Sequence, residues 1–203
     1  MEKITSQIHK QFRHNRLAKF DEMNVLQTKK HINTLYARTY KDIIKEFNAV
    51  FDDLIKYIYE FALDYGFDGE ISELQNNFVE ELFSEYNPVM KYVFNREYNR
   101  KRDRLFESLI AYPGGTEQSY KTAENLLIRQ ITEFSVLYTD NVMLAVYEEL
   151  GVQYVKWVTE EDSRVCHICR DLDGTVYKIT DAPEKAHPNC RCYLIPYKKS
   201  EKT

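Results

Sequence analysis

Apolar side chains recur every three or four residues along the first part of the chain, the spacing that places them on one face of a helix. No glycine or proline interrupts residues 1–65. The apolar positions of this stretch are Ile4, Ile8, Phe12, Ile32, Leu35, Tyr36, Tyr40, Ile43, Ile44, Phe47, Val50, Phe51, Leu54, Ile55 and Ile58. We therefore predict long amphipathic helices here, which end where Gly66 and Gly69 permit turns.

Three more helices are predicted before the sequence pattern changes at Gly151. The first covers residues 72–86 and begins at Ser72, which opens a Ser-x-x-Gln capping box. The next begins at Asn87-Pro88, because Asn is a good N-cap and Pro suits the first helical turn. The last is long and covers residues 117–150, with Gly151 at the place of a left-handed C-cap glycine.

After Gly151, β-branched and aromatic residues replace the helical periodicity. Three short strands are predicted: within "VQYVKWV", after the Asp173-Gly174 turn of "DLDGTVYKI", and within "CRCYLIPY", where Pro196 indicates an edge strand or the end of a strand. The predicted fold class is α+β, with a mostly α-helical region over residues 1–150 and a small β-rich module over residues 151–203. Three short strands bury too little apolar surface to be stable alone, so we expect the module to need a staple.

All four cysteines lie in two short segments of this module, "CHIC" and "HPNCRC". A Cys-x-x-Cys turn lets the thiolates of Cys166 and Cys169 converge on one ion at about 2.3 Å from each. Cys190 and Cys192 would point to the same face of a strand, and His187 offers a second knuckle with Cys190. Sulfur-rich tetrahedral sites suit Zn²⁺. The sequence therefore predicts a zinc-stapled module in which either Cys192 or His187 is the fourth ligand.

Charged residues around the cysteines are expected to support this site. Asp162 and Asp171 are predicted to form hydrogen bonds or ion pairs, with Arg164 or Arg191 as partners. Arg191 lies between two cysteines, so its charge would also offset the net charge of about −2 of a four-thiolate zinc site.

Two enzymatic interpretations compete with the metal site. A thioredoxin-like Cys-x-x-Cys needs a βαβ context, which the preceding sequence does not supply. A nucleophilic Cys190 or Cys192 beside His187 lacks an assignable orienting residue, and zinc would occupy the same side chains. The chain also lacks a phosphate-binding glycine-rich loop, a serine nucleophile elbow and a His-Glu-x-x-His motif. We therefore expect that the protein is not an enzyme.

The charge and the hydropathy of the sequence indicate in which compartment the protein works and which classes of partner it has. The net charge of −4 argues against a protein that coats nucleic acid through its bulk charge. The N-terminal residues do not resemble a secretory signal, and no segment approaches the ~20 apolar residues needed to cross a bilayer. We expect no membrane partner and a reducing compartment, where clustered cysteines bind metal more often than they form disulfides.

Two basic clusters bear on nucleic-acid binding. The N-terminal cluster comprises Lys10, Arg13, Arg16 and Lys19, and the second comprises Arg96, Arg100, Lys101, Arg102 and Arg104. On a helix, Arg96, Arg100 and Arg104 share one face and would contact phosphates without sequence specificity. The alternative is a solvated helix face with intrahelical pairs such as Glu97–Lys101. The sequence leaves both interpretations open.

The segment "DSRVCHICRDLDGTVYKI" together with "HPNCRCYLIP" resembles the C-terminal domain of phage head-morphogenesis (Mu F-like) minor capsid proteins. The matching features are Asp162 and Arg164 before the Cys-x-x-Cys, Leu172-Asp173-Gly174, and the box from His187 to Cys192. The resemblance covers about residues 154–197.

This resemblance implies a minor structural protein of a tailed phage or prophage. Its expected partners are the portal protein, other capsid or scaffold proteins and, without sequence specificity, packaged DNA. Its expected location is the interior of the virion head, and the host cytoplasm during prohead assembly. The resemblance also implies a role in DNA packaging or ejection. The alternatives are a zinc-containing nucleic-acid-binding protein and a Cys/His thiol enzyme.

Overall fold

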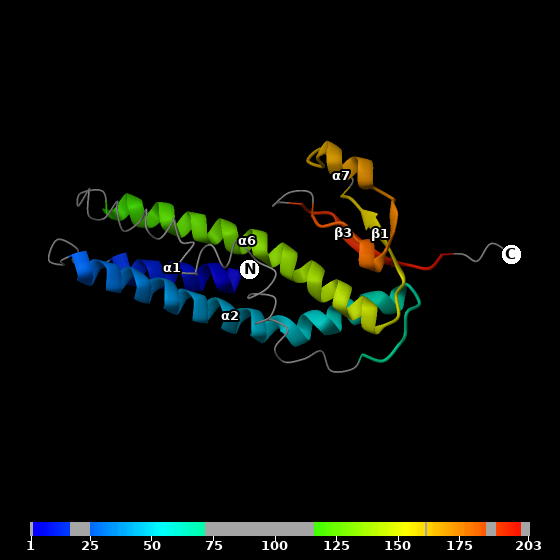
Figure 1. The fold of residues 1–203 in the computed structure, drawn as a ribbon, viewed down its shortest axis with the longest axis horizontal. Helices are drawn as coiled ribbons and strands as arrows, with labels where there is room; N and C mark the ends of the chain where they lie inside the picture. Colours follow the sequence, from blue (N-terminus) through cyan, green and yellow to red (C-terminus); the bar gives the residue numbers. More distant parts are fainter. Residues whose placement is uncertain (1, 17–24, 72–115, 161, 186–189, 200–203) are drawn as a thin grey trace. The chain divides into compact units, whose positions relative to one another are not determined.

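The computed structural model describes residues 2–16, 25–71, 116–160, 162–185 and 190–199. Figure 1 draws the remaining residues as a thin grey trace. The two helices predicted between residues 72 and 115 lie outside the described residues, as does the second basic cluster.

Three long helices form most of the described chain: α1 (Glu2–Arg16), α2 (Val25–Asp64) and α6 (Thr116–Glu149). The predicted apolar stripe is buried at Ile4, Ile8, Phe12, Ile32, Leu35, Tyr36, Ile43, Phe47, Phe51 and Ile58. Val50 departs from the prediction and is exposed, because the neighbouring Phe51 takes the buried position of that turn. None of the described helices combines the length and the apolar content that a membrane span needs.

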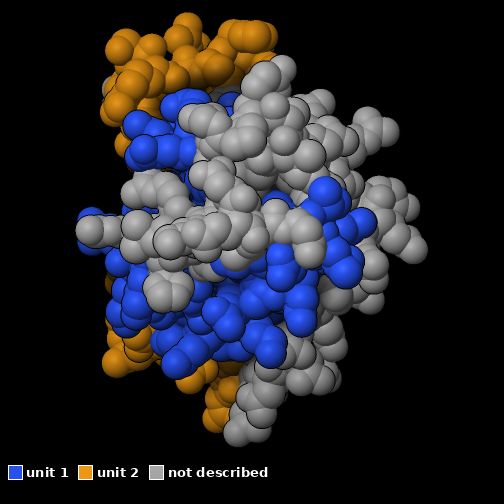
Figure 2. Space-filling model, turned by 90° about the vertical axis from the view of Figure 1, so that its left-hand side faces the viewer, with its two compact units in different colours: residues 1–50, 77–134 blue, residues 51–76, 135–203 orange. Residues whose placement is uncertain are grey.

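Contacts between Cα atoms divide the chain into two compact units, which Figure 2 colours separately. Unit 1 comprises residues 1–50 and 77–134, and its described part is helical. Its core is aromatic: the ring of Phe12 meets those of Tyr36 and Tyr120 edge-on at 6.2 and 6.3 Å, and Phe47 meets Phe134 at 5.2 Å. These contacts join α1, the first part of α2 and the first part of α6.

Unit 2 comprises residues 51–76 and 135–203, so it contains the ends of α2 and α6 as well as a three-stranded sheet. The strands are β1 (Tyr154–Val158), β2 (Val176–Lys178) and β3 (Tyr193–Tyr197). Their order is β2-β1-β3, and both pairings are antiparallel. Pro196 lies on the edge strand β3, as predicted, opposite Val155.

Side chains from the last turns of α6 and from the sheet form the core of unit 2. Val155 and Trp157 of β1 are fully buried, and so is Tyr147 of α6. The hydroxyl of Tyr147 donates a hydrogen bond to the carbonyl oxygen of Leu194 at 3.3 Å. The helical region and the small sheet together confirm the α+β fold class, while a domain boundary at residue 150 stays a prediction.

Gly151 ends α6 and directs the chain into β1. Its φ is +71°, a left-handed conformation that favours glycine. The Gly151 N–H donates to the carbonyl of Glu148 at 3.0 Å, and the Val152 N–H donates to that of Tyr147 at 2.9 Å. These two bonds form a Schellman motif, and Val152, the residue after the glycine, is buried. The predicted C-cap glycine is therefore confirmed.

Three local features differ from the predictions. The Cys-x-x-Cys segment forms the start of a short helix, α7 (His167–Leu172), rather than a turn. Cys190 and Cys192 were expected on a strand, but they lie just before β3 begins at Tyr193. A 3-10 helix, η4 (Ile179–Asp181), follows β2 and was not predicted.

Candidate metal centre

Cys166 and Cys169 are held together at the start of α7. Cys166 is the N-cap residue, with an extended backbone (φ −71°, ψ 160°). Its Sγ accepts the backbone N–H of Cys169 at 3.4 Å. The sulfur of Cys166 therefore accepts the N-cap hydrogen bond that a serine or aspartate oxygen accepts in most helices. This cap places the thiols of Cys166 and Cys169 at the same end of α7. Cys169 is buried and Cys166 is half-buried.

Cys190 and Cys192 reach the same place from the segment before β3. Both are buried, whereas Arg191 between them is exposed. The Sγ atoms of Cys169 and Cys190 lie 3.5 Å apart. The sulfurs of Cys169, Cys190 and Cys192 all lie within 4.8 Å of one another. The structure thus gathers three of the five predicted ligands into one buried group.

This group fits a tetrahedral ion. Zn–S bonds of about 2.3 Å in tetrahedral geometry separate the sulfurs by about 3.8 Å. The Cys169–Cys190 separation of 3.5 Å and the 4.8 Å limit of the whole group bracket that value. His187 lies outside the described residues, whereas its alternative for the fourth position, Cys192, is part of the group.

Burial and hydrogen bonding set the protonation of these thiols. Burial raises the pKa of Cys169, and the nearby thiols of Cys166 and Cys190 raise it further. Burial also raises the pKa of Cys192. The pKa of Cys166 is lowered, chiefly because the backbone N–H of Cys169 donates to its sulfur. Buried thiols resist ionisation unless a cation compensates the thiolate charge, and a bound divalent metal does so.

Asp162 ties the two cysteine segments together from outside. Both of its carboxylate oxygens accept hydrogen bonds from Nη2 of Arg191 at 2.7 Å. Its Oδ1 also accepts the backbone N–H of Arg164 at 2.9 Å. The hydrogen bond from Arg191, followed by that from Arg164, lowers the pKa of Asp162 to about 2. The predicted role of Asp162 is confirmed, whereas within the described residues Asp171 has no hydrogen-bond or ion-pair partner.

A second ion pair of unit 2 was not predicted. Nζ of Lys185 lies 3.2 Å from Oδ1 of Asp140 on α6, and the two side chains are only 10% and 18% exposed. The same Nζ donates to the carbonyl oxygen of Cys192 and lies 5.4 Å from the centre of the Trp157 ring. Burial raises the pKa of Asp140, against the opposing effect of Lys185. The pair joins α6 to the cysteine segment across 45 residues, so no sequence spacing indicates it.

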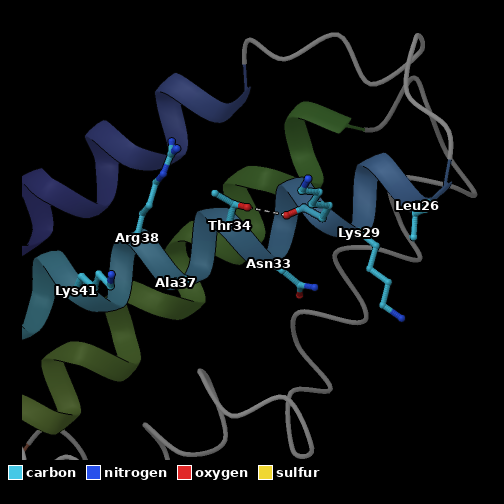
Figure 3. A pocket seen from close by; sticks show the side chains of 8 residues that line it. Leu26, Lys29, Asn33, Thr34, Ala37, Arg38 and Lys41 are labelled. Atoms are coloured by element: carbon cyan, nitrogen blue, oxygen red, sulfur yellow. Dashed lines mark hydrogen bonds between the residues drawn. The ribbon is translucent and has the colours of Figure 1, made fainter.

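A basic surface on α2 was also missed. The predicted phosphate-binding residues Arg96, Arg100, Lys101 and Arg104 lie outside the described residues, and so nothing here tests them. Residues 25–41 of α2, however, carry four basic residues and no acidic one. These four residues belong to the lining of a hollow of about 660 Å³. Among the described residues, that lining is formed by Leu26, Lys29, Lys30, Asn33, Thr34, Ala37, Arg38 and Lys41. Figure 3 shows these side chains along successive turns of α2. A charge count by helix segment would have found this surface.

One family of known proteins matches the part of the chain that contains the candidate metal centre. The model of one family, described as Phage Mu protein F like protein, matches residues 107–195. The match includes the four cysteines, the described length of α6 and nearly all of the sheet. No curated protein and no solved structure matches the chain significantly. The resemblance indicated by the cysteine segments is thereby confirmed: residues 107–195 match the Phage Mu protein F like family of head-morphogenesis proteins.

Proposed function

We propose that this chain is a phage head-morphogenesis protein, a minor capsid protein of a tailed phage or prophage that binds the portal and enters the head during prohead assembly. The observation that carries the proposal is the family match over residues 107–195, which includes every cysteine of the chain. In this role the long helices supply the surface for the portal. The C-terminal module supplies a second folded part, and the protein acts in DNA packaging or ejection without catalysis.

The metal in this proposal is zinc, and its role is structural. Its ligands are Cys166, Cys169 and Cys190, with either Cys192 or His187 in the fourth position. The donor chemistry supports a metal here, because the buried thiols of Cys169, Cys190 and Cys192 lie within 4.8 Å of one another, as a closed tetrahedral site needs. Cys166 is not part of that group, and its place as a ligand is proposed from its position at the start of α7. When bound, the ion would offset the thiolate charge and hold the short α7 and the segment before β3 together.

The state of the thiols argues against a thiol enzyme. A nucleophilic cysteine needs a lowered pKa and access to a substrate. Burial instead raises the pKa of Cys169 and Cys192. Cys166 has the lowered pKa, but its sulfur is engaged as the N-cap of α7. These features support a structural role for the whole group.

The test of the portal proposal is co-expression with the portal protein encoded by the same phage. We expect the two proteins to elute together from a sizing column, and the chain to be found by mass spectrometry in purified heads. If heads assemble and package DNA normally without the chain, or if it is absent from them, the proposal fails.

Binding to DNA is a second candidate function, supported by the charge of α2. Four basic residues lie in residues 25–41, whereas residues 42–64 contain six acidic and two basic residues. All four basic side chains, Lys29, Lys30, Arg38 and Lys41, are exposed on α2. Exposed cations along one helix suit the phosphate backbone of DNA.

Gel shifts across a salt series would test this second function. If four cations neutralise four phosphates of duplex DNA, the logarithm of affinity falls with the logarithm of salt with a slope of about −3.6. Replacing Lys30 and Arg38 by Gln should reduce that slope to about −1.8. Lys56→Gln is the matched control, since Lys56 lies in the acidic half of the same helix and pairs with Glu60 at 4.0 Å. An unchanged slope in the double variant would exclude the α2 surface.

A further inference from the structure

Trp157 is buried in a way that leaves one of its polar atoms without a partner. It is the single tryptophan of the chain, and its side chain is 0% exposed. Within the described residues, its indole N–H makes no hydrogen bond. Burying a donor without an acceptor costs free energy, so an orphaned group in a well-packed core calls for a specific explanation.

Three observations place the indole of Trp157 beside Cys192. In the β1–β3 ladder Trp157 is opposite Leu194, two residues after Cys192. Nζ of Lys185 lies over the Trp157 ring and donates to the carbonyl oxygen of Cys192. Trp157 and Cys192 are both buried, at 0% and 6% exposure, and both belong to unit 2.

The chemistry of sulfur explains why this donor lacks a partner. A neutral thiol is a weak hydrogen-bond acceptor. A thiolate carries a negative charge, and hydrogen bonds to charged groups are the stronger ones. A metal-bound thiolate keeps lone pairs for such a bond, and donors of this kind orient ligands and tune the metal. The indole N–H is therefore matched to Cys192 as a ligand and poorly matched to Cys192 as a free thiol.

We infer that Cys192 is the fourth metal ligand in place of His187, and that Trp157 is its positioning residue, donating the indole N–H to the Cys192 sulfur. This inference rests on the proposed metal site. Lys185 completes the support, since its charge lies next to the same ligand and is held by Asp140 of α6 at 3.2 Å. Cys192 is thus fixed by groups from three places: β1, the loop before β3, and α6.

The test uses the full chain loaded with Co²⁺, whose sulfur-to-metal charge-transfer band reports the donor strength of the thiolates. Because the chain has one tryptophan, biosynthetic replacement of tryptophan by benzothienylalanine changes Trp157 alone. This analogue has sulfur in place of the N–H and nearly the same shape. We expect the band to move to longer wavelength, and Zn²⁺ to be lost to a chelator about tenfold faster.

Three variants complete the design. Tyr154→Phe is the matched control, because Tyr154 lies on β1 but on the opposite face to the buried Trp157. It should leave both the band and the release rate unchanged. His187→Ala should keep the full charge-transfer intensity, and Cys192→Ser should lose about a quarter of it, since one sulfur of four is removed.

The outcomes separate this inference from the metal site itself. An unchanged band and release rate in the analogue overturn the role of Trp157. Loss of metal by His187→Ala with full intensity in Cys192→Ser makes His187 the fourth ligand and overturns the inference. A wild-type chain that takes up neither Co²⁺ nor Zn²⁺ overturns the metal site as well.

Discussion

The stability of unit 2 should depend on free zinc, and Cys169→Ser should remove that dependence. Cys169 is 1% exposed, and its sulfur lies next to those of Cys190 and Cys192, so it is central to the proposed site. Serine keeps the size of the side chain but supplies a poor ligand for zinc. His167→Ala is the matched control, because His167 is an exposed residue of α7 beside the same ligands.

The magnitude follows from linkage. A ligand that binds only the folded state adds about 1.4 kcal/mol for each tenfold rise in its free concentration above Kd, and about 4.1 kcal/mol at 1,000 times Kd. Unit 2 contains roughly 100 residues. For a domain of that size 1 kcal/mol shifts Tm by about 4–8 °C. The wild-type Tm of unit 2 should therefore rise by about 6–11 °C per tenfold rise in free zinc.

Trp157 makes the assay local, since the only tryptophan of the chain is fully buried in unit 2 and becomes exposed when that unit unfolds. Its fluorescence is followed on heating in zinc buffers of increasing free concentration. The larger share of the described helical residues lies in unit 1, which has its own aromatic core. Most of the far-ultraviolet circular dichroism should therefore melt without zinc dependence. This reasoning would be refuted if the wild-type Tm of unit 2 did not change with free zinc. It would also be refuted if the Tm of Cys169→Ser rose with zinc as steeply as that of the wild type.

Three further predictions concern unit 2 and the buried tyrosines. Tyr147→Phe removes the hydrogen bond to the Leu194 carbonyl and should lower the free energy of unfolding by about 1 kcal/mol, measured by denaturant titration; no change would mean that the 3.3 Å contact contributes nothing. Lys185→Met leaves the buried carboxylate of Asp140 unpaired and should cost about 3–5 kcal/mol, whereas adding Asp140→Leu should recover much of that loss; a double variant as unstable as the single one would contradict this. Burial raises the pKa of Tyr120, Tyr138 and Tyr147 above the ordinary value of 10.0, so the folded state favours their neutral form. This contribution is complete below pH 10 and is lost as the pH rises further, and spectrophotometric titration should show these phenols ionising only as the protein unfolds.

The long elements could be predicted because each repeats a strong local signal. The stripe from Ile4 to Ile58 follows the helical period over many turns, and Gly151 has the backbone conformation that a C-cap requires. The strands were predicted from their β-branched and aromatic residues, and Pro196 indicated that β3 lies at an edge of the sheet.

The short elements escaped prediction because their causes are not periodic. The helix α7 has six residues, too few for an amphipathic pattern, and it begins with a sulfur cap at Cys166 that propensities for N-caps do not include. Cys190 and Cys192 were expected to converge through the alternation of a strand. They converge from the segment before β3 instead, which only tertiary packing determines.

Of the contacts around the metal centre, some could be predicted from the sequence and others could not. Asp162 was predicted to pair with Arg164 or Arg191 because these residues flank cysteines, and the structure joins it to Arg191 at 2.7 Å. The Lys185–Asp140 pair depends on how α6 packs within unit 2. A lysine in a polar loop and an aspartate on a helix do not stand out in a sequence with 32 acidic and 28 basic residues.

The central claim is that the two cysteine segments hold one zinc ion through sulfur. X-ray absorption at the zinc edge, on the full chain purified without added metal chelators, tests it most directly. We predict one zinc per chain with four sulfur neighbours at about 2.3 Å. A zinc shell made of nitrogen and oxygen atoms, or a folded chain without zinc, would contradict the account.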